Sequence, residues 1–212
     1  MHTHPLIGAL VEDLPSSPRR MSEQIRFRVG ISTVLVGSVF YGLYGLRDDG
    51  IAALGDVRFL FKLSLLLALI LALWPVLHRA AGPIAVKPRD LRLLGWAALY
   101  WLAMIGGEAM LLPRGEWNRA LMGENGIFCL TVMPLIGLPL LAAMLVTLRG
   151  GAPEGAVASG AVAGFFCASV AGLIYAVHCP DDSPFFVVFW YGAVAIALTV
   201  MGALSGRLLL RW

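Results

Sequence analysis

The sequence contains few charged residues. Only 14% of its 212 residues are Asp, Glu, Lys or Arg, whereas about a quarter are charged in a typical soluble domain. Long runs lack charge almost entirely, which argues against a soluble domain and for a membrane protein. The net charge is only +3, and the basic residues lie at the ends of apolar runs. We therefore expect no direct binding to nucleic acid.

Cysteine is also scarce, with three residues and no Cys-X-X-Cys motif, so neither a thioredoxin-type site nor a zinc ribbon is expected. No two of the four histidines occupy facing positions in the middle of a predicted span, so bis-histidine haem ligation is not expected. The first 28 residues are polar and contain Pro5, Pro15 and Pro18. They lack the early apolar core of a cleavable signal peptide.

Six apolar segments are long enough to cross the membrane as helices. They cover residues 29–46, 59–79, 93–112, 126–148, 156–177 and 184–206. Helices are expected because an open strand edge in lipid leaves backbone groups unsatisfied. The sequence therefore predicts an all-α bundle of six transmembrane helices (29–212), preceded by a cytoplasmic N-terminal segment (1–28).

The distribution of Lys and Arg predicts the orientation, because basic loops stay in the cytoplasm. With the N-terminus inside, most of the 16 basic residues lie on the cytoplasmic side. The remainder are Arg47, Arg58, Lys62, Arg114 and Arg119. We therefore expect a multi-pass protein of the bacterial inner membrane with both termini in the cytoplasm.

Small residues recur every four positions along the fifth segment. They are Ala156, Gly160, Gly164, Ala168, Gly172 and Ala176. Small residues let two helix backbones approach closely in lipid. Gly202 and Gly206 form a similar pair in the sixth segment. We therefore expect these two helices to pack tightly.

Two charged residues fall inside predicted spans. Lys62 and Glu108 lie at similar depth near the outer side, and an unpaired charge in hydrocarbon costs roughly 3 kcal/mol on insertion scales. We expect them to form a structural ion pair. The alternatives are part of an ion path, or two side chains that reach to the outer surface.

Cys129 and Cys179 both fall at the predicted outer face, whereas Cys167 lies in the middle of a span and is expected to be a small apolar filler. In an oxidising periplasm the pair could form a disulfide. It could instead bind a soft metal ion, with His178, Asp181 or Asp182 nearby, or remain as free thiols. A soft metal ion is the only cofactor that the sequence suggests.

The N-terminal segment contains a short amphipathic pattern that ends at Pro15. Leu6, Ile7, Leu10, Val11 and Leu14 share one helical face. Such a helix binds either the membrane surface or the groove of a protein partner. Its polar face carries Glu12 and Asp13 rather than basic residues, which favours a protein partner.

Six stretches of the chain are distinctive: 148–153 (LRGGAP), 175–185 (YAVHCPDDSPF), 190–192 (WYG), 210–212 (LRW), 6–7 (LI) and 13–14 (DL). Through these stretches, and over nearly its whole length, the chain resembles the NrsF type of membrane anti-sigma factors, named for negative regulation of a sigma factor F. Residues 15–18 depart from the Pro-Val-rich turn of that family.

The resemblance implies a protein that holds an extracytoplasmic-function sigma factor at the membrane and releases it under metal or oxidative stress. It implies that Cys129 and Cys179 are the sensing residues. It also makes the N-terminal tail the expected site for gripping the sigma factor, with the loops 80–92 and 149–155 assisting. The tail residues concerned are Leu6, Ile7, Leu10, Val11, Asp13 and Leu14.

Two other functions compete with this regulatory, non-enzymatic one. A membrane enzyme of thiol–disulfide exchange would need a second thiol pair or a bound quinone, and the sequence offers no second pair. A small transporter usually has more polar groups near the midplane and visible inverted repeats, neither of which is found here.

Overall fold

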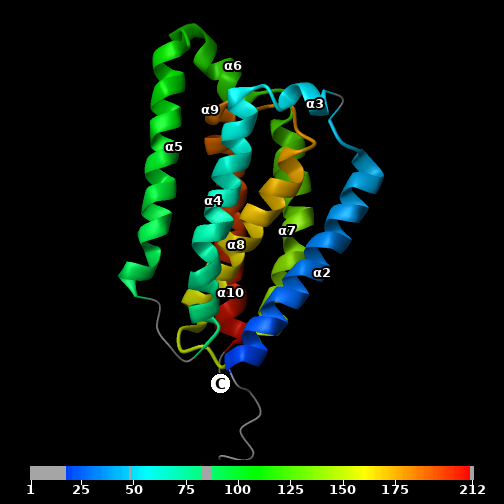
Figure 1. The fold of residues 1–212 in the computed structure, drawn as a ribbon, viewed down its shortest axis with the longest axis vertical. Helices are drawn as coiled ribbons and strands as arrows, with labels where there is room; N and C mark the ends of the chain where they lie inside the picture. Colours follow the sequence, from blue (N-terminus) through cyan, green and yellow to red (C-terminus); the bar gives the residue numbers. More distant parts are fainter. Residues whose placement is uncertain (1–17, 48, 83–86, 211–212) are drawn as a thin grey trace, which may run out of the picture.

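The computed structural model describes residues 18–47, 49–82 and 87–210. Within these ranges all regular secondary structure is helical, and six helices are long and apolar enough to cross a membrane (Figure 1). The long helices are α2 (Pro18–Tyr44), α4 (Val57–Ala80), α5 (Arg92–Leu111), α7 (Gly126–Arg149), α8 (Ala156–Ala176) and α10 (Gly192–Leu209). The sixth span also includes α9 (Pro184–Phe186) and the π-helical turn η3 (Val187–Tyr191). The chain is thus an all-α membrane protein.

Five of the six expected segments agree with these helices to within a few residues. The exception is the first, because α2 begins at Pro18 whereas the apolar run begins at residue 29. Hydropathy marks only the part of a helix that suits hydrocarbon. A helix can continue into the polar region for as long as its backbone hydrogen bonds are made, and α2 does so over its Arg-containing first turns.

The two ends of the bundle differ. One end carries the loop 177–183 between α8 and α9, and we call it the Cys179 end; it is uppermost in Figure 1. The short helices at this end are α3 (Gly50–Ala53), η2 (Arg114–Glu116), α6 (Trp117–Met122) and α9. The opposite end contains the start of α2, the end of α10 and the turn η1 (Pro88–Leu91). We call it the terminal end.

Helix α8 lies at the centre of the bundle and contacts α4, α7 and, most extensively, α10. Glycines make this last contact possible. A Cβ atom added at Gly160 would lie 2.1 Å from the carbonyl oxygen of Gly202, and one at Gly164 would lie 2.2 Å from that of Leu198. The expected close packing of α8 and α10 is therefore present. Of the other stripe residues, Ala168 is buried, and Gly172 faces the side chains of Leu66, Met133 and Tyr191.

Helix α5 is peripheral. It packs mainly against α4 and buries only Ala97 and Glu108. Charged contacts hold it near both ends, from Glu108 to Arg58 and, just before its start, from Asp90 to Arg79. Between these ends α5 buries little surface, although the hydroxyls of Tyr100 and of Ser64 on α4 make a 2.9 Å hydrogen bond.

Candidate functional site

The loop 177–183 lies between helices α8 and α9 and carries His178, Cys179, Asp181 and Asp182. It follows α8 directly, since the amide of Cys179 donates to the carbonyl of Tyr175 at 3.0 Å. It ends where the hydroxyl of Ser183 accepts the amide of Phe185 at 3.2 Å and caps α9. Both ends of the loop are thus fixed by helix termini.

A fully buried lysine on α4 binds this loop. The Nζ atom of Lys62, on α4, donates to the carbonyl oxygen of Cys179 at 2.8 Å and to that of Asp181 at 3.3 Å. It also lies 2.5 Å from Oδ1 of Asp182, as a charge contact without hydrogen-bond alignment. Two carbonyl oxygens and one carboxylate of the same loop therefore converge on one ammonium group, and each supplies negative potential to a charge that has no access to water.

Asp182 is shared between two cations. Its Oδ2 atom accepts from Nη1 of Arg47 at 2.9 Å, and both side chains are buried. The guanidinium of Arg47 also binds Asp49 at 2.5 and 2.8 Å. These hydrogen bonds from Arg47 lower the pKa of Asp49, and the contacts with Asp49 raise the pKa of Arg47 against the opposing effect of burial. The connection after α2, the start of α4 and the Cys179 loop are therefore joined by one charge network.

Lys62 and Glu108 take different partners from those expected. Glu108 binds Arg58 through 2.9 and 3.1 Å contacts and accepts weakly from the hydroxyl of Ser183 at 3.4 Å. The expected Lys62–Glu108 pair is therefore replaced by Lys62–Asp182 and Arg58–Glu108. The reason is geometric: Lys62 and Arg58 are four residues apart on α4, and the loop 177–183 folds over the lysine while α5 approaches the arginine.

Asp181 links the loop to the helix that carries Cys129. Its carboxylate accepts from the backbone amide of Asn125 at 2.9 Å, from the Asn125 side chain at 3.0 Å and from the amide of Glu124 at 3.2 Å. These groups lie at the N-terminus of α7, where free amides and the helix dipole favour a carboxylate. A movement of the loop would therefore be felt at the start of α7.

Cys129 and Cys179 lie at this same end, and both are free and fully buried. The thiol of Cys129 contacts Sδ of Met133 at 3.3 Å. Burial raises the pKa of Cys179, against the opposing effect of the Lys62 ammonium. Because the thiolate is the reactive form, the raised pKa and the burial of Cys179 both slow its reactions in this arrangement. Cys167 is buried within α8 between apolar neighbours, where a filler is expected.

The suggested ligands of a soft metal ion are engaged elsewhere. The Nδ1 atom of His178 lies 3.1 Å from the carbonyl oxygen of Gly45, and its ring packs among aromatic side chains. These are Phe40, Tyr44, Phe128 and Tyr175. Across the described ranges, no three His, Cys, Asp or Glu side chains gather as a metal site requires. The buried ammonium of Lys62 further disfavours a cation, so the site as arranged does not fit a resident metal.

Some residues of the site were not predicted. The sequence placed Arg47 and Arg58 only on the outer side, and it gave Met133 no role because a Met in an apolar run is ordinary. Tyr175 belongs to one of the stretches that carry the family resemblance, but the sequence did not predict its place beside the thiols. Arg47 had one usable signal, since a cluster of charges follows it directly at the end of an apolar run. The residues of the N-terminal tail, Leu6 to Leu14, lie outside the described residues.

Comparison with known proteins gives a consistent result. The family model for NrsF, negative regulator of sigma F, matches residues 10–212. The anti-sigma-F factor NrsF of Caulobacter vibrioides is 29% identical over 227 aligned positions, which cover the full length of both chains. A probable anti-sigma-F factor NrsF of Azospira oryzae is 29% identical over 122 positions, covering 58% of this chain and 55% of that protein. No solved structure matches.

The matched region includes all six spans, the charge network and the loop that carries Cys179. The resemblance noted in the sequence is therefore confirmed over almost the entire chain. This six-helix membrane protein belongs to the NrsF family, the negative regulators of sigma F.

Proposed function

We propose that the protein is a membrane-bound anti-sigma factor that holds an extracytoplasmic-function sigma factor in the cytoplasm and releases it when Cys129 and Cys179 react with an oxidant or a thiophilic metal ion. The main support for the proposal is that the loop 177–183 at the Cys179 end is held in place by several polar contacts. Lys62 binds the backbone and side chain of this loop, and Asp181 ties it to α7. Oxidation or metal binding at either thiol would have to disturb these contacts.

In this function the Cys179 end lies in the periplasm. Most of the Lys and Arg residues that flank the spans are at the terminal end, and such residues favour the cytoplasmic side. An oxidising compartment would then surround the loop with the two thiols, where a disulfide is chemically stable. The bilayer itself would be that of the inner membrane.

The reaction requires the site to open. Both thiols are fully buried, so a reagent reaches them only when the loop 177–183 moves away from Lys62. With a peroxide as oxidant, two thiols and one peroxide give one disulfide and two water molecules. The reacted pair would favour a second arrangement of the loop, which is the two-state element that a switch needs.

A chain of contacts leads from the thiols to the terminal end. Cys129 is on α7, Cys179 follows α8, and these helices are joined at the terminal end by residues 150–155. That connection touches α2 and the end of α4. A Cβ atom at Gly151 would lie 3.0 Å from the methyl carbon of Met21 and 1.9 Å from the carbonyl oxygen of Ala81. Met21 is in the first turns of α2, directly after the tail.

The tail is proposed to grip the sigma factor through its apolar face, with Leu6, Ile7, Leu10, Val11 and Leu14 as the contact residues and Asp13 beside them. The described parts of the loops 80–92 and 149–155 lie at the terminal end of the bundle, where α2 begins. A shift of the 150–155 connection would move Met21 and thereby the position of the tail.

The test uses the full-length protein and its cognate sigma factor in membranes. Wild-type protein should retain the sigma factor and lose it after peroxide or cadmium treatment. A Cys129→Ser, Cys179→Ser variant should retain it under both conditions, whereas the matched Cys167→Ser variant should respond like the wild type. Normal release from the double variant would refute the role of the thiols. Co-purification that survives deletion of residues 1–17 would refute the role of the tail.

A further inference from the structure

Few residues of helix α2 are buried. Of its described residues, only Ile25, Gly37 and Phe40 are shielded in this way, and its main helical neighbour is α7. Apolar packing therefore holds α2 less firmly than it holds α8, most of whose residues are buried. Because residues 1–17 lead directly into α2, the position of this helix determines where the tail begins.

Polar contacts at the Cys179 end join α2 to the segment 174–182. The hydroxyl of Tyr41 donates to the carbonyl oxygen of Ile174, in the last turn of α8, at 2.7 Å. Directly after α2, the carbonyl oxygen of Gly45 lies 3.1 Å from Nδ1 of His178. The last turn of α2 and the residue that follows it thus contact both the end of α8 and the loop that carries Cys179.

Arg47 adds a charged contact to these neutral ones. Its Nη1 atom donates to Oδ2 of Asp182 at 2.9 Å, and both side chains are buried. Its backbone amide donates to the carbonyl of Val177 at 3.4 Å, and its guanidinium lies 4.8 Å from the ring centroid of Phe59. Charge-assisted hydrogen bonds are roughly twice as strong as neutral ones. Arg47 therefore makes the main polar link between α2 and the loop.

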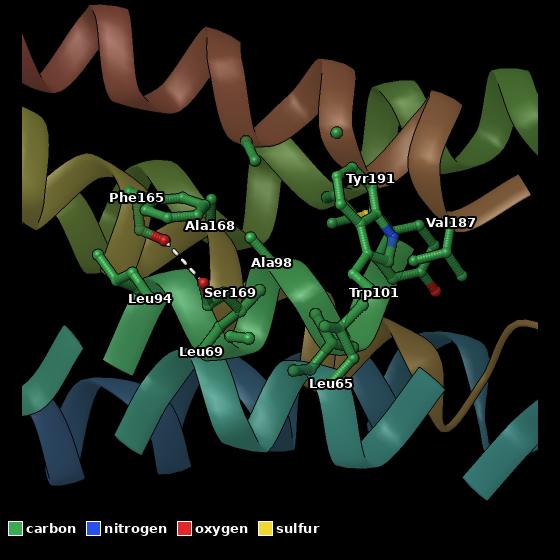
Figure 2. A pocket seen from close by; sticks show the side chains of 15 residues that line it. Leu65, Leu69, Leu94, Ala98, Trp101, Phe165, Ala168, Ser169, Val187 and Tyr191 are labelled. Atoms are coloured by element: carbon green, nitrogen blue, oxygen red, sulfur yellow. Dashed lines mark hydrogen bonds between the residues drawn. The ribbon is translucent and has the colours of Figure 1, made fainter. Parts of the chain in front are cut away.

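Helix α5 lacks such a link. A cavity of about 320 Å³, lined by Ala98 and Trp101 of α5 among other residues, lies between this helix and the rest of the bundle (Figure 2). At the Cys179 end, α5 is attached through Glu108 to Arg58 of α4. This pair reaches the loop only through the weak 3.4 Å contact of Glu108 with Ser183. Arg58 is therefore a matched control for Arg47, since it lies at the same end but anchors a different helix.

The reaction of the thiols would remove the partners of Arg47. The loop 177–183 must leave Lys62 before a reagent reaches the buried thiols. Asp182 is in this loop and binds Lys62 through one carboxylate oxygen and Arg47 through the other. The same movement therefore withdraws Asp182 and the carbonyl of Val177 from Arg47. Helix α2 then loses the polar contacts that supplement its limited apolar packing.

We propose that Arg47 is a positioning residue that holds α2 in the arrangement in which the tail retains the sigma factor. Opening of the loop breaks the contact with Asp182 and frees the Cys179 end of α2, so the helix tilts. Over the roughly 40 Å length of α2, a tilt of about 5° moves one end by about 3–4 Å relative to the other. The inference rests on the proposed function and gives it a direct route to the tail, which bypasses the 150–155 connection.

The first experiment measures retention of the cognate sigma factor by the full-length protein in membranes, without oxidant. Arg47→Gln should retain at least about threefold less sigma factor than the wild type, because a buried charged hydrogen bond is lost. Arg47→Lys keeps a cation for Asp182 and should recover most of the retention, whereas Arg58→Gln should behave like the wild type. Tyr41→Phe should show a smaller loss than Arg47→Gln, and Tyr44→Phe, at an exposed neighbouring position, should show none.

The same experiment separates this step from the thiol chemistry. Alkylation and mass analysis should find the thiols of Arg47→Gln reduced, and its poor retention should persist when Cys129→Ser and Cys179→Ser are added. Wild-type retention by both Arg47→Gln and Tyr41→Phe, with normal size-exclusion profiles, would overturn the proposal even if the thiols are the sensor. Normal stress-induced release from the cysteine double variant would instead refute the thiol sensor, while poor retention by Arg47→Gln would still support the role of Arg47.

A second measurement needs no sigma factor. Nitroxides on Leu43→Cys of α2 and Ile196→Cys of α10, both exposed positions, report the distance between these helices in protein whose three native cysteines are replaced by serine. Arg47→Gln should shift or broaden this distance by at least about 3 Å, as expected for a tilt of the helix. The pair Ile127→Cys and Ile196→Cys, between α7 and α10, should not change. An unchanged α2 distance, or an equal change in both pairs, would overturn the proposal.

Discussion

Helices α8 and α5 are about equally long, and both are apolar enough to cross a membrane, yet they are held in opposite ways. Most residues of α8 are buried, and its backbone touches that of α10 at Gly160 and Gly164. On α5 only Ala97 and Glu108 are buried, and charged contacts fix its two ends. Hydropathy predicts that a helix enters the membrane, but small residues and polar anchors decide which neighbours it keeps.

The largest expected effect is that of a bulky residue at the centre of the α8–α10 contact. Gly164→Leu should abolish folding, because even a Cβ atom there would lie 2.2 Å from a backbone oxygen. Gly107→Leu on α5 should be tolerated, since an added Cβ there meets nothing within 4 Å. Size-exclusion profiles and thermal unfolding in detergent measure both. Similar stability of the two variants would contradict the inference that α8 is packed more tightly than α5.

The next effect concerns the loop that follows α8. Lys62→Met should destabilise the protein by about 3 kcal/mol, because it leaves two buried loop carbonyls without a donor and leaves Asp182 with Arg47 as its one remaining cation. Asp182→Asn in the same chain should recover part of this loss, and a double-mutant cycle in denaturant gives the coupling energy. Additive losses would show that the lysine does not act through Asp182.

A smaller effect is expected at the end of α5. Glu108→Gln should cost about 1 kcal/mol or less, because the partner Arg58 is about half exposed and remains solvated when unpaired. The change should appear as faster hydrogen exchange in the upper turns of α5, with that of α8 unchanged. Equal acceleration in both helices would mean that α5 is part of the same cooperative unit as α8.

The smallest free-energy effect concerns the Cys179 thiol. Burial raises the pKa of this thiol in the folded protein. The contribution of the thiol to the free energy of unfolding is therefore fully present below the pKa that the thiol has in the unfolded chain, and it is lost as pH rises through the pKa that it has in the folded protein. A protein with Cys179 as its only cysteine should react with iodoacetamide at least about tenfold more slowly at pH 8 than one with only Arg114→Cys, placed in the exposed turn after α5. Equal rates would show that the loop opens freely.

The sequence was sufficient to predict most of the topology. Uncharged runs identified all six spans, and the four-residue spacing of small residues predicted the α8–α10 contact. The start of α2 was misplaced because hydropathy does not register a helix that extends beyond the hydrocarbon.

The partners of Lys62 and Glu108 could not be derived in this way. Hydropathy gives the depth of a side chain but not the rotation of its helix or the path of a loop above it. Lys62 and Glu108 do lie at similar depth, yet Asp182 and Arg58 reach them first.

The pairing of Lys62 with Asp182 has a consequence for biosynthesis. The ribosome completes α4 long before it reaches Asp182, so the young chain must insert a lysine whose counter-ion has not yet been made. Such a residue costs roughly 3 kcal/mol on insertion scales, and the surrounding leucines of α4 are sufficient to offset it. This charge is neutralised only after the last two spans have been inserted and the loop between them has reached Lys62. An incompletely assembled copy therefore keeps an unpaired lysine within its membrane-spanning region, which the finished protein does not have.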